Sequence, residues 1–183
     1  FLAQEGSILA TTPVDKLGDG TNNRSAAQII YDAAHGLYPA ASGDWNGISV
    51  NAGTGTVNPK IILVYLEKEQ SLISNQNAGQ DNLDCAMGYD IDGSGCQNMF
   101  ANHPSLRGFA SQVGNGAWQL RYDYEYALRG TKPAGFASHY VVNDSTTFYG
   151  EDKYNNPASQ YYNTAYYGPF DVRIGNAATA AVY

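Results

Sequence analysis

The sequence predicts a mainly α-helical (α+β) fold with a small β or loop subdomain. Three observations favour this class. Several segments carry apolar residues at helical spacing, residues that cap helices precede two of them, and stretches rich in glycine, serine and asparagine lie between them. A chain of 183 residues with 43% hydrophobic content can bury one core. We therefore expect a single domain over residues 21–183, preceded by a linker or loop over residues 1–20.

A first helix is expected over residues 26–34, where apolar side chains recur at helical spacing. The polar residues 22–25 before it include side chains that cap helix N-termini, and Gly36 after it is a typical helix stop. The next stretch, residues 40–56, is rich in glycine, serine and asparagine. It predicts a loop with local turns.

A second helix is expected over residues 59–74. Asn58 can cap this helix with its side chain, and Pro59 suits the first helical position because its φ angle is already set. Residues 105–129 predict a further helix that is interrupted near its glycines 114 and 116. The alanine-rich residues 176–183 also predict a helix.

Charge and composition exclude some partners. The chain has 10 Lys and Arg against 17 Asp and Glu, and this net charge of −7 argues against nucleic acid, which requires a basic surface. No run approaches the roughly 18 apolar residues of a membrane span. The 15 tyrosines and many amide and hydroxyl side chains suit a sugar-binding surface. We expect a monomer without a metal or cofactor.

The two cysteines indicate where the protein works. Cys85 and Cys96 flank a glycine-rich stretch and are expected to form a disulfide, which favours an oxidising location and hence a secreted or cell-envelope protein. The chain begins at Phe1, without an initiator methionine or a signal peptide. This beginning predicts a processed or excised piece.

Glu69 is the candidate catalytic acid of the second expected helix. On a helical wheel it falls near the middle of the apolar sector, whereas Glu67 falls on the polar side and is expected to face solvent. That sector contains Ile62, Tyr65, Leu66, Leu72 and Ile73. A carboxyl group at the wall of an apolar cleft is desolvated when charged, which favours its protonated form, and glycosidic cleavage needs a proton donor. The alternative is a partly exposed acid paired with a neighbouring cation.

The residues around Glu69 carry a resemblance to a known superfamily. Residues 66–72, with the sequence LEKEQSL, resemble the catalytic helix of goose-type lysozymes and lytic transglycosylases, in which Glu is followed closely by Ser and an apolar residue. In this chain Gln70 stands between Glu69 and Ser71. The order of further segments is similar to that of a group of uncharacterised exported bacterial domains with lysozyme-like character. These segments are residues 26–34, 58–64, 68–72, 86–89 and 108–113.

The resemblance implies a lysozyme-like domain with a glycan groove between its helical part and a small β or loop subdomain. Glu69 would be the general acid that cleaves the bond between N-acetylmuramic acid and N-acetylglucosamine in peptidoglycan. Lytic transglycosylases have a Gln that lines this groove, and Gln112 is its candidate equivalent. Ser71 and Tyr89 are the other candidate substrate-binding residues.

A second acid would decide the chemistry, because glycosidases use two carboxylates whereas lytic transglycosylases use one Glu. Asp90 and Asp92 are the candidates, since a disulfide would hold the loop that contains them. Their loop also alternates oxygen ligands as a calcium loop does, but its twelfth position is Ala101, so a polar turn accounts better for it. Hydrolase and transglycosylase both remain open.

Two other classes remain as alternatives. The first is a non-catalytic cell-wall- or glycan-binding module, or a surface structural domain, that has a lysozyme-like fold without activity. The inserted Gln70 favours this alternative. The second is a wall-piercing domain of a phage or secretion system, which would share the chemistry and differ in its partner.

Overall fold

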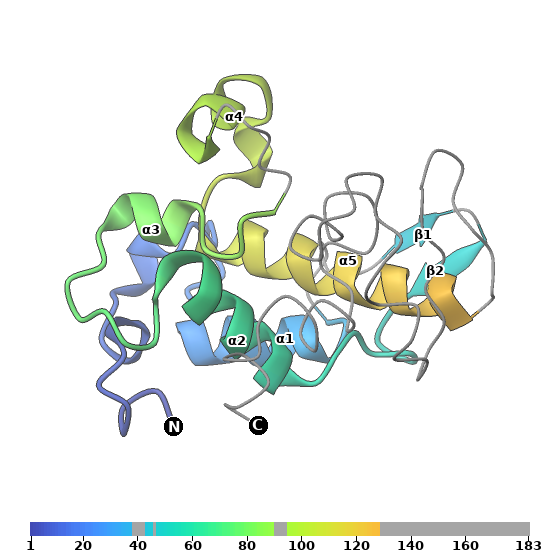
Figure 1. Cartoon of the computed structure of the whole chain (residues 1–183), viewed down its shortest axis with the longest axis horizontal. Coiled ribbons are helices and arrows are strands. Elements are labelled where there is room, and N and C mark those ends of the chain that lie inside the picture. The colour runs from blue at the N-terminus through green and yellow to red at the C-terminus, as the bar shows by residue number, and fades with distance from the viewer. Residues whose placement is uncertain (38–42, 46, 90–94, 129–183) are drawn as a thin grey trace, which may run out of the picture.

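The computed structural model describes residues 1–37, 43–45, 47–89 and 95–128. Helix α5 forms the centre of this part, and α1, α2 and α3 pack against it, while a β-hairpin lies beside its C-terminal half (Figure 1). The elements are the 3-10 turns η1 (Ile8–Ala10), η2 (Val14–Lys16) and η4 (Pro104–Leu106), the strands β1 (Gly43–Trp45) and β2 (Ile48–Val50), and the helices α1 (Ala26–Ala34), α2 (Pro59–Gln70), α3 (Gln80–Asp84), α4 (Cys96–Asn102) and α5 (Phe109–Leu128). The predicted mainly helical class is confirmed. The helix expected over residues 176–183 lies outside the described residues.

Helices α1 and α2 begin where their caps predict. The Ser25 hydroxyl accepts a hydrogen bond from the Gln28 N–H, and the Asn58 side chain accepts one from the Lys60 N–H. Helix α2 ends at Gln70, four residues before the predicted end. The cause is Ser71, which has a left-handed backbone with φ of 52° and so turns the chain out of the helix.

Helix α5 is continuous, so the predicted interruption near Gly114 and Gly116 is wrong. Gly116 serves close packing instead: a Cβ atom there would lie 2.8 Å from the Met87 side chain. The break in the chain comes earlier, at Gly108, whose φ of 101° precedes the first turn of α5. A glycine within a helix pattern therefore marks a contact here and not an end.

Strands β1 and β2 form a β-hairpin in the stretch that was predicted as a loop. Strands β1 and β2 are antiparallel, with Trp45 paired to Ile48 and Gly43 to Val50. Ile48 and Val50 are buried while Ser49 between them is exposed, which is the alternation of a half-buried strand. Three residues a strand are too few for that pattern to stand out in the sequence.

The main apolar core is built from α1, α2, α3 and α5, and the first twenty residues contribute to it. Leu9 and Leu17 are buried in the same cluster as the apolar faces of α1, α2 and α5. The Ala110 N–H donates to the Leu17 carbonyl, and the Ser7 hydroxyl donates to the Leu72 carbonyl. The segment expected to be a linker or loop therefore packs on the domain through its own 3-10 turns.

An ion-pair network joins this segment to α1. The Arg24 guanidinium forms hydrogen bonds with Asp19, which is buried, and with Asp32 at 2.9 Å. Burial alone would raise the pKa of the Asp19 carboxyl, but hydrogen bonds from Arg24 and Asn22 and the charge of Arg24 hold that pKa below its usual value. The network therefore stabilises the fold while Asp19 is charged.

The substitution Asp19→Asn should lower the free energy of unfolding by about 1–3 kcal/mol at pH 7, because Arg24 loses its charged acceptor. The folded pKa lies below the unfolded one, so this stabilisation is full above the unfolded value of about 4 and is lost as the pH falls through the folded value. Urea denaturation at several pH values measures it. Asp15→Asn is the control, because it removes the same charge at an exposed position. An equal loss of unfolding free energy in the two variants would contradict the prediction.

Candidate functional site

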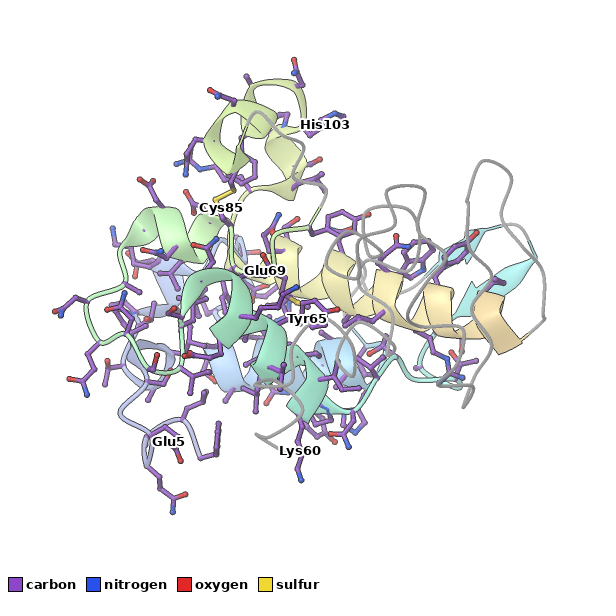
Figure 2. The ribbon with its side chains drawn as sticks, in the orientation of Figure 1. Glu5, Lys60, Tyr65, Glu69, Cys85 and His103 are labelled. Carbon is purple, nitrogen blue, oxygen red and sulfur yellow. A yellow bond between two sulfur atoms is a disulfide. The ribbon has the colours of Figure 1, made fainter. Side chains whose placement is uncertain are left out.

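Glu69 lies on the last turn of α2, with Tyr65 one turn before it, on the side of the helix that meets α5 (Figure 2). Its side chain is only 17% exposed. The carboxyl group rests against Gly88, where a Cβ atom would be 2.9 Å from Oε2 and 3.2 Å from Cδ. The candidate acid is thus enclosed by its own helix and by the backbone of the loop at residues 85–89.

Lys68 forms an ion pair with Glu69. Pairing with a neighbouring cation was the alternative to a catalytic role for Glu69. Its Nζ lies 3.1 Å from Glu69 Oε1 and 5.2 Å from the centre of the Tyr65 ring. A quarter of the Lys68 side chain is exposed. Because Glu69 is mostly buried, Lys68 is a charge partner that an approaching glycosidic oxygen would have to replace.

Glu67, which was predicted to face solvent, is partly exposed and binds the chain that follows α2. Its Oε2 accepts hydrogen bonds from the N–H groups of Ile73 and Ser74, at 3.1 and 3.0 Å, and its Oε1 accepts one from the Ser74 hydroxyl at 2.6 Å. These bonds hold the chain that follows α2. The two glutamates therefore have different contacts: the Glu69 carboxyl group lies against Gly88, whereas the Glu67 carboxylate binds the backbone after α2.

Gln70 and Ser71, which follow Glu69, form the C-terminal end of α2. Ser71 is exposed, and its N–H donates to the Glu67 carbonyl at 2.8 Å. The Gln70 side chain accepts a hydrogen bond from Asn82 of α3 at 3.0 Å. Gln70, which separates Glu69 from Ser71 in the sequence, therefore fastens the end of α2 to α3.

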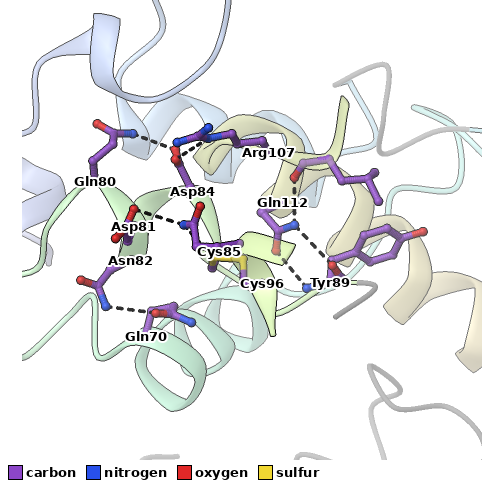
Figure 3. The surroundings of a disulfide bond; sticks show 12 residues. Gln70, Gln80, Asp81, Asn82, Asp84, Cys85, Tyr89, Cys96, Arg107 and Gln112 are labelled. Atoms are coloured by element: carbon purple, nitrogen blue, oxygen red, sulfur yellow. Dashed lines mark hydrogen bonds and ion pairs between the residues drawn. A yellow bond between two sulfur atoms is a disulfide. The ribbon is translucent and has the colours of Figure 1, made fainter. Parts of the chain in front are cut away.

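Gln112 is completely buried on α5 and does not face a groove. Its Oε1 accepts a hydrogen bond from the Tyr89 N–H at 2.9 Å, and its Nε2 donates to the carbonyls of Leu106 at 2.9 Å and Tyr89 at 3.3 Å (Figure 3). The predicted contact of Gln112 with a sugar is therefore wrong, because both polar atoms of its side chain already bind backbone groups. Gln112 holds the half-buried Tyr89 in place.

The other end of the loop at residues 85–89 is fixed by the predicted disulfide between Cys85 and Cys96, which the structure contains. The neighbouring Asp84 is buried, and its carboxylate binds Arg107 Nε at 2.6 Å and Gln80 Nε2 at 2.8 Å (Figure 3). The loop is thus anchored before Cys85 and again at Tyr89. Gly88, which faces Glu69, lies between these anchors.

Asp90 and Asp92 lie outside the described residues. Elsewhere, Trp118 and Tyr122 stack with their ring centres 5.0 Å apart, as their spacing of four predicts. A cavity of about 400 Å³ opens at the start of α2, lined by Ala34, residues 54–58, Ile61 and Arg121. It is about 12 Å or more along the helix from Glu69. Within the described ranges, no three His, Cys, Asp or Glu residues are grouped to hold a metal ion.

Comparisons with known proteins found no match among family models, curated proteins or solved structures. In the part of the chain that the structure describes, no helix is both long and apolar enough to cross a bilayer.

The substitutions Glu67→Ala and Glu69→Ala should have different effects on stability. Glu67→Ala should lower the free energy of unfolding by about 1–2 kcal/mol, because two N–H groups and a hydroxyl lose a charged acceptor. Glu69→Ala should cost less than Glu67→Ala, because the ion pair with Lys68 is partly exposed whereas Glu67 binds two backbone N–H groups. Urea denaturation compares them, and a larger loss in Glu69→Ala would contradict the assignment of Glu67 to structure.

Proposed function

We propose that this protein cleaves the glycan strands of bacterial peptidoglycan, with Glu69 as the general acid. The observation that carries the proposal is the placement of Glu69: its largely enclosed carboxyl group lies at the end of α2 against the backbone of Gly88, while the neighbouring Glu67 is occupied by its loop. Glu69 would protonate the oxygen between N-acetylmuramic acid and N-acetylglucosamine as the bond breaks.

The contacts of the Glu69 carboxyl group define how a sugar would reach it. Oε2 faces Gly88, so the leaving oxygen would approach Oε1 and take the place of Lys68. The partly buried Tyr89, which packs against the core, would contact the sugar with the part of its ring that remains exposed, and the exposed Ser71 would offer its hydroxyl. Gln112 acts indirectly, by fixing Tyr89.

The second step depends on Asp90, which follows Tyr89 directly in the sequence, or on Asp92, two residues after Asp90. A carboxylate from either residue beside the sugar would make the reaction a hydrolysis. Without one, a group of the sugar itself would complete the reaction and leave an anhydro product, as in lytic transglycosylases. The disulfide between Cys85 and Cys96 favours a secreted or cell-envelope protein, which is where the substrate lies.

A glycan-binding domain without catalysis is the second candidate. The ion pair between Lys68 and Glu69 and the bond between Gln70 and Asn82 favour it, because both occupy groups near the candidate acid. This candidate requires the protein to bind peptidoglycan without cutting it. Replacement of Glu69 would then leave binding unchanged.

The two candidates are separated by release of soluble fragments from purified peptidoglycan. Glu69→Gln should lower the rate by about 100-fold or more, because a general acid contributes 10²–10⁴-fold. Glu67→Gln is the matched control on the same helix and should retain most activity at temperatures where it stays folded. Mass spectrometry of the products distinguishes reducing ends from anhydro ends.

Equal rates for the parent protein and Glu69→Gln would overturn the role of Glu69. Absence of release by the parent protein, together with its retention on insoluble peptidoglycan, would identify the binding domain instead.

A further inference from the structure

Gly88 is the residue against which the Glu69 carboxyl group lies, and two separate constraints act on it. Its φ of 64° is in the left-handed region, which disfavours residues that have a Cβ atom. A Cβ atom there would also lie 2.9 Å from Glu69 Oε2, 3.2 Å from Cδ and 3.4 Å from Cγ. Nonbonded carbon and oxygen atoms do not approach to 2.9 Å without repulsion, so the two side chains cannot share this space.

The loop that contains Gly88 is held on both sides, so it has little freedom to move away from Glu69. The Gly88 N–H donates to the Cys85 carbonyl at 2.9 Å, and Cys85 is bonded to Cys96. Directly after Gly88, both backbone polar groups of Tyr89 bind the buried Gln112. Gly88 itself is buried.

Glu69 is the movable partner in this contact. The atoms nearest to Gly88 are the far end of a side chain with three rotatable bonds, at the last turn of α2. A side chain added at residue 88 would therefore turn the Glu69 carboxyl group outward and leave the backbone of the loop where it is. The absence of a side chain at Gly88 sets the position of the carboxyl group.

We propose that Gly88 is a positioning residue for the Glu69 carboxyl group: it leaves the space in which that group rests and thereby aims Oε1 at the bond to be cleaved. The contact stands on the geometry alone, whereas its catalytic consequence rests on the function proposed above. A shift of about 1 Å in a catalytic group can cost about 100-fold in rate, so the effect of Gly88 on catalysis is large.

Gly88→Ala tests the proposal, and Gly20→Ala is its matched control. Gly20 has a φ of 63°, nearly the same as Gly88, and a Cβ atom there would meet nothing within 4 Å. Both variants carry the same backbone strain, which should lower the melting temperature by about 2–6 °C. Only Gly88→Ala also displaces Glu69.

The first measurement is the steady-state rate of peptidoglycan release. In Gly88→Ala, kcat should fall by about 10–100-fold with KM nearly unchanged, because the acid is displaced while the sugar-binding surface is intact. Gly20→Ala should keep the kcat of the parent protein at temperatures where both are folded. Equal kcat values in the two variants of an active parent protein would overturn the proposal.

The second measurement does not need activity. In protein labelled with ¹³C-glutamate, the Glu69 carboxyl resonance is assigned by its loss in Glu69→Gln. It should shift in Gly88→Ala and stay in place in Gly20→Ala. A shift in Gly88→Ala with no cleavage by the parent protein would keep the contact and reject the proposed function, whereas an unchanged resonance would reject the contact.

A third variant covers the case in which Gly88→Ala does not fold. The double variant Glu69→Ala with Gly88→Ala removes the carboxyl group that the new Cβ atom would meet. Recovery of a folded protein by circular dichroism supports the contact between the two residues. A double variant that stays unfolded would show that backbone strain alone explains Gly88, and would overturn the proposal.

Discussion

The hydrogen bonds of the Gln112 carboxamide are the interaction on which the candidate site depends. Gln112 lies in the core on α5, so the packing of that helix sets its position. By binding Tyr89 at both backbone polar groups and Leu106 at its carbonyl, it fixes two chain segments to α5. A buried amide that loses a partner costs about 1–3 kcal/mol, so separation of either segment from Gln112 is unfavourable. Gln112 therefore holds Tyr89, the residue after Gly88, against α5.

Features set by neighbouring residues could be predicted from the sequence. The caps at Ser25 and Asn58 act within three residues, so the starts of α1 and α2 followed from local patterns. The disulfide followed from the presence of only two cysteines. The wheel placed Glu69 and Glu67 in different directions because helical spacing is regular. What the wheel left open was the environment of each carboxyl group.

Features set by distant contacts could not be predicted in this way. The hairpin depends on burial of Ile48 and Val50 by other elements, and Gly116 lies within α5 because Met87 packs on it. Glu67 binds N–H groups six and seven residues later, which requires the turn at Ser71. Gln112 resembled a groove residue by its order in the chain. Its hydrogen bonds to the backbone of Tyr89 depend on the fold and could not be predicted from that order.

The disulfide between Cys85 and Cys96 also has a consequence for how α4 is attached to the rest of the described chain. Among the described residues, the main core contains no residue of α4, and Phe100 of that helix packs instead in a small cluster with the two cysteines and Leu106. Reduction of the disulfide would therefore remove the covalent link between α4 and Cys85 without taking any residue out of the main core. The described part of the chain thus has one helix whose attachment responds to the redox state of its surroundings, while the packing of α1, α2 and α5 does not.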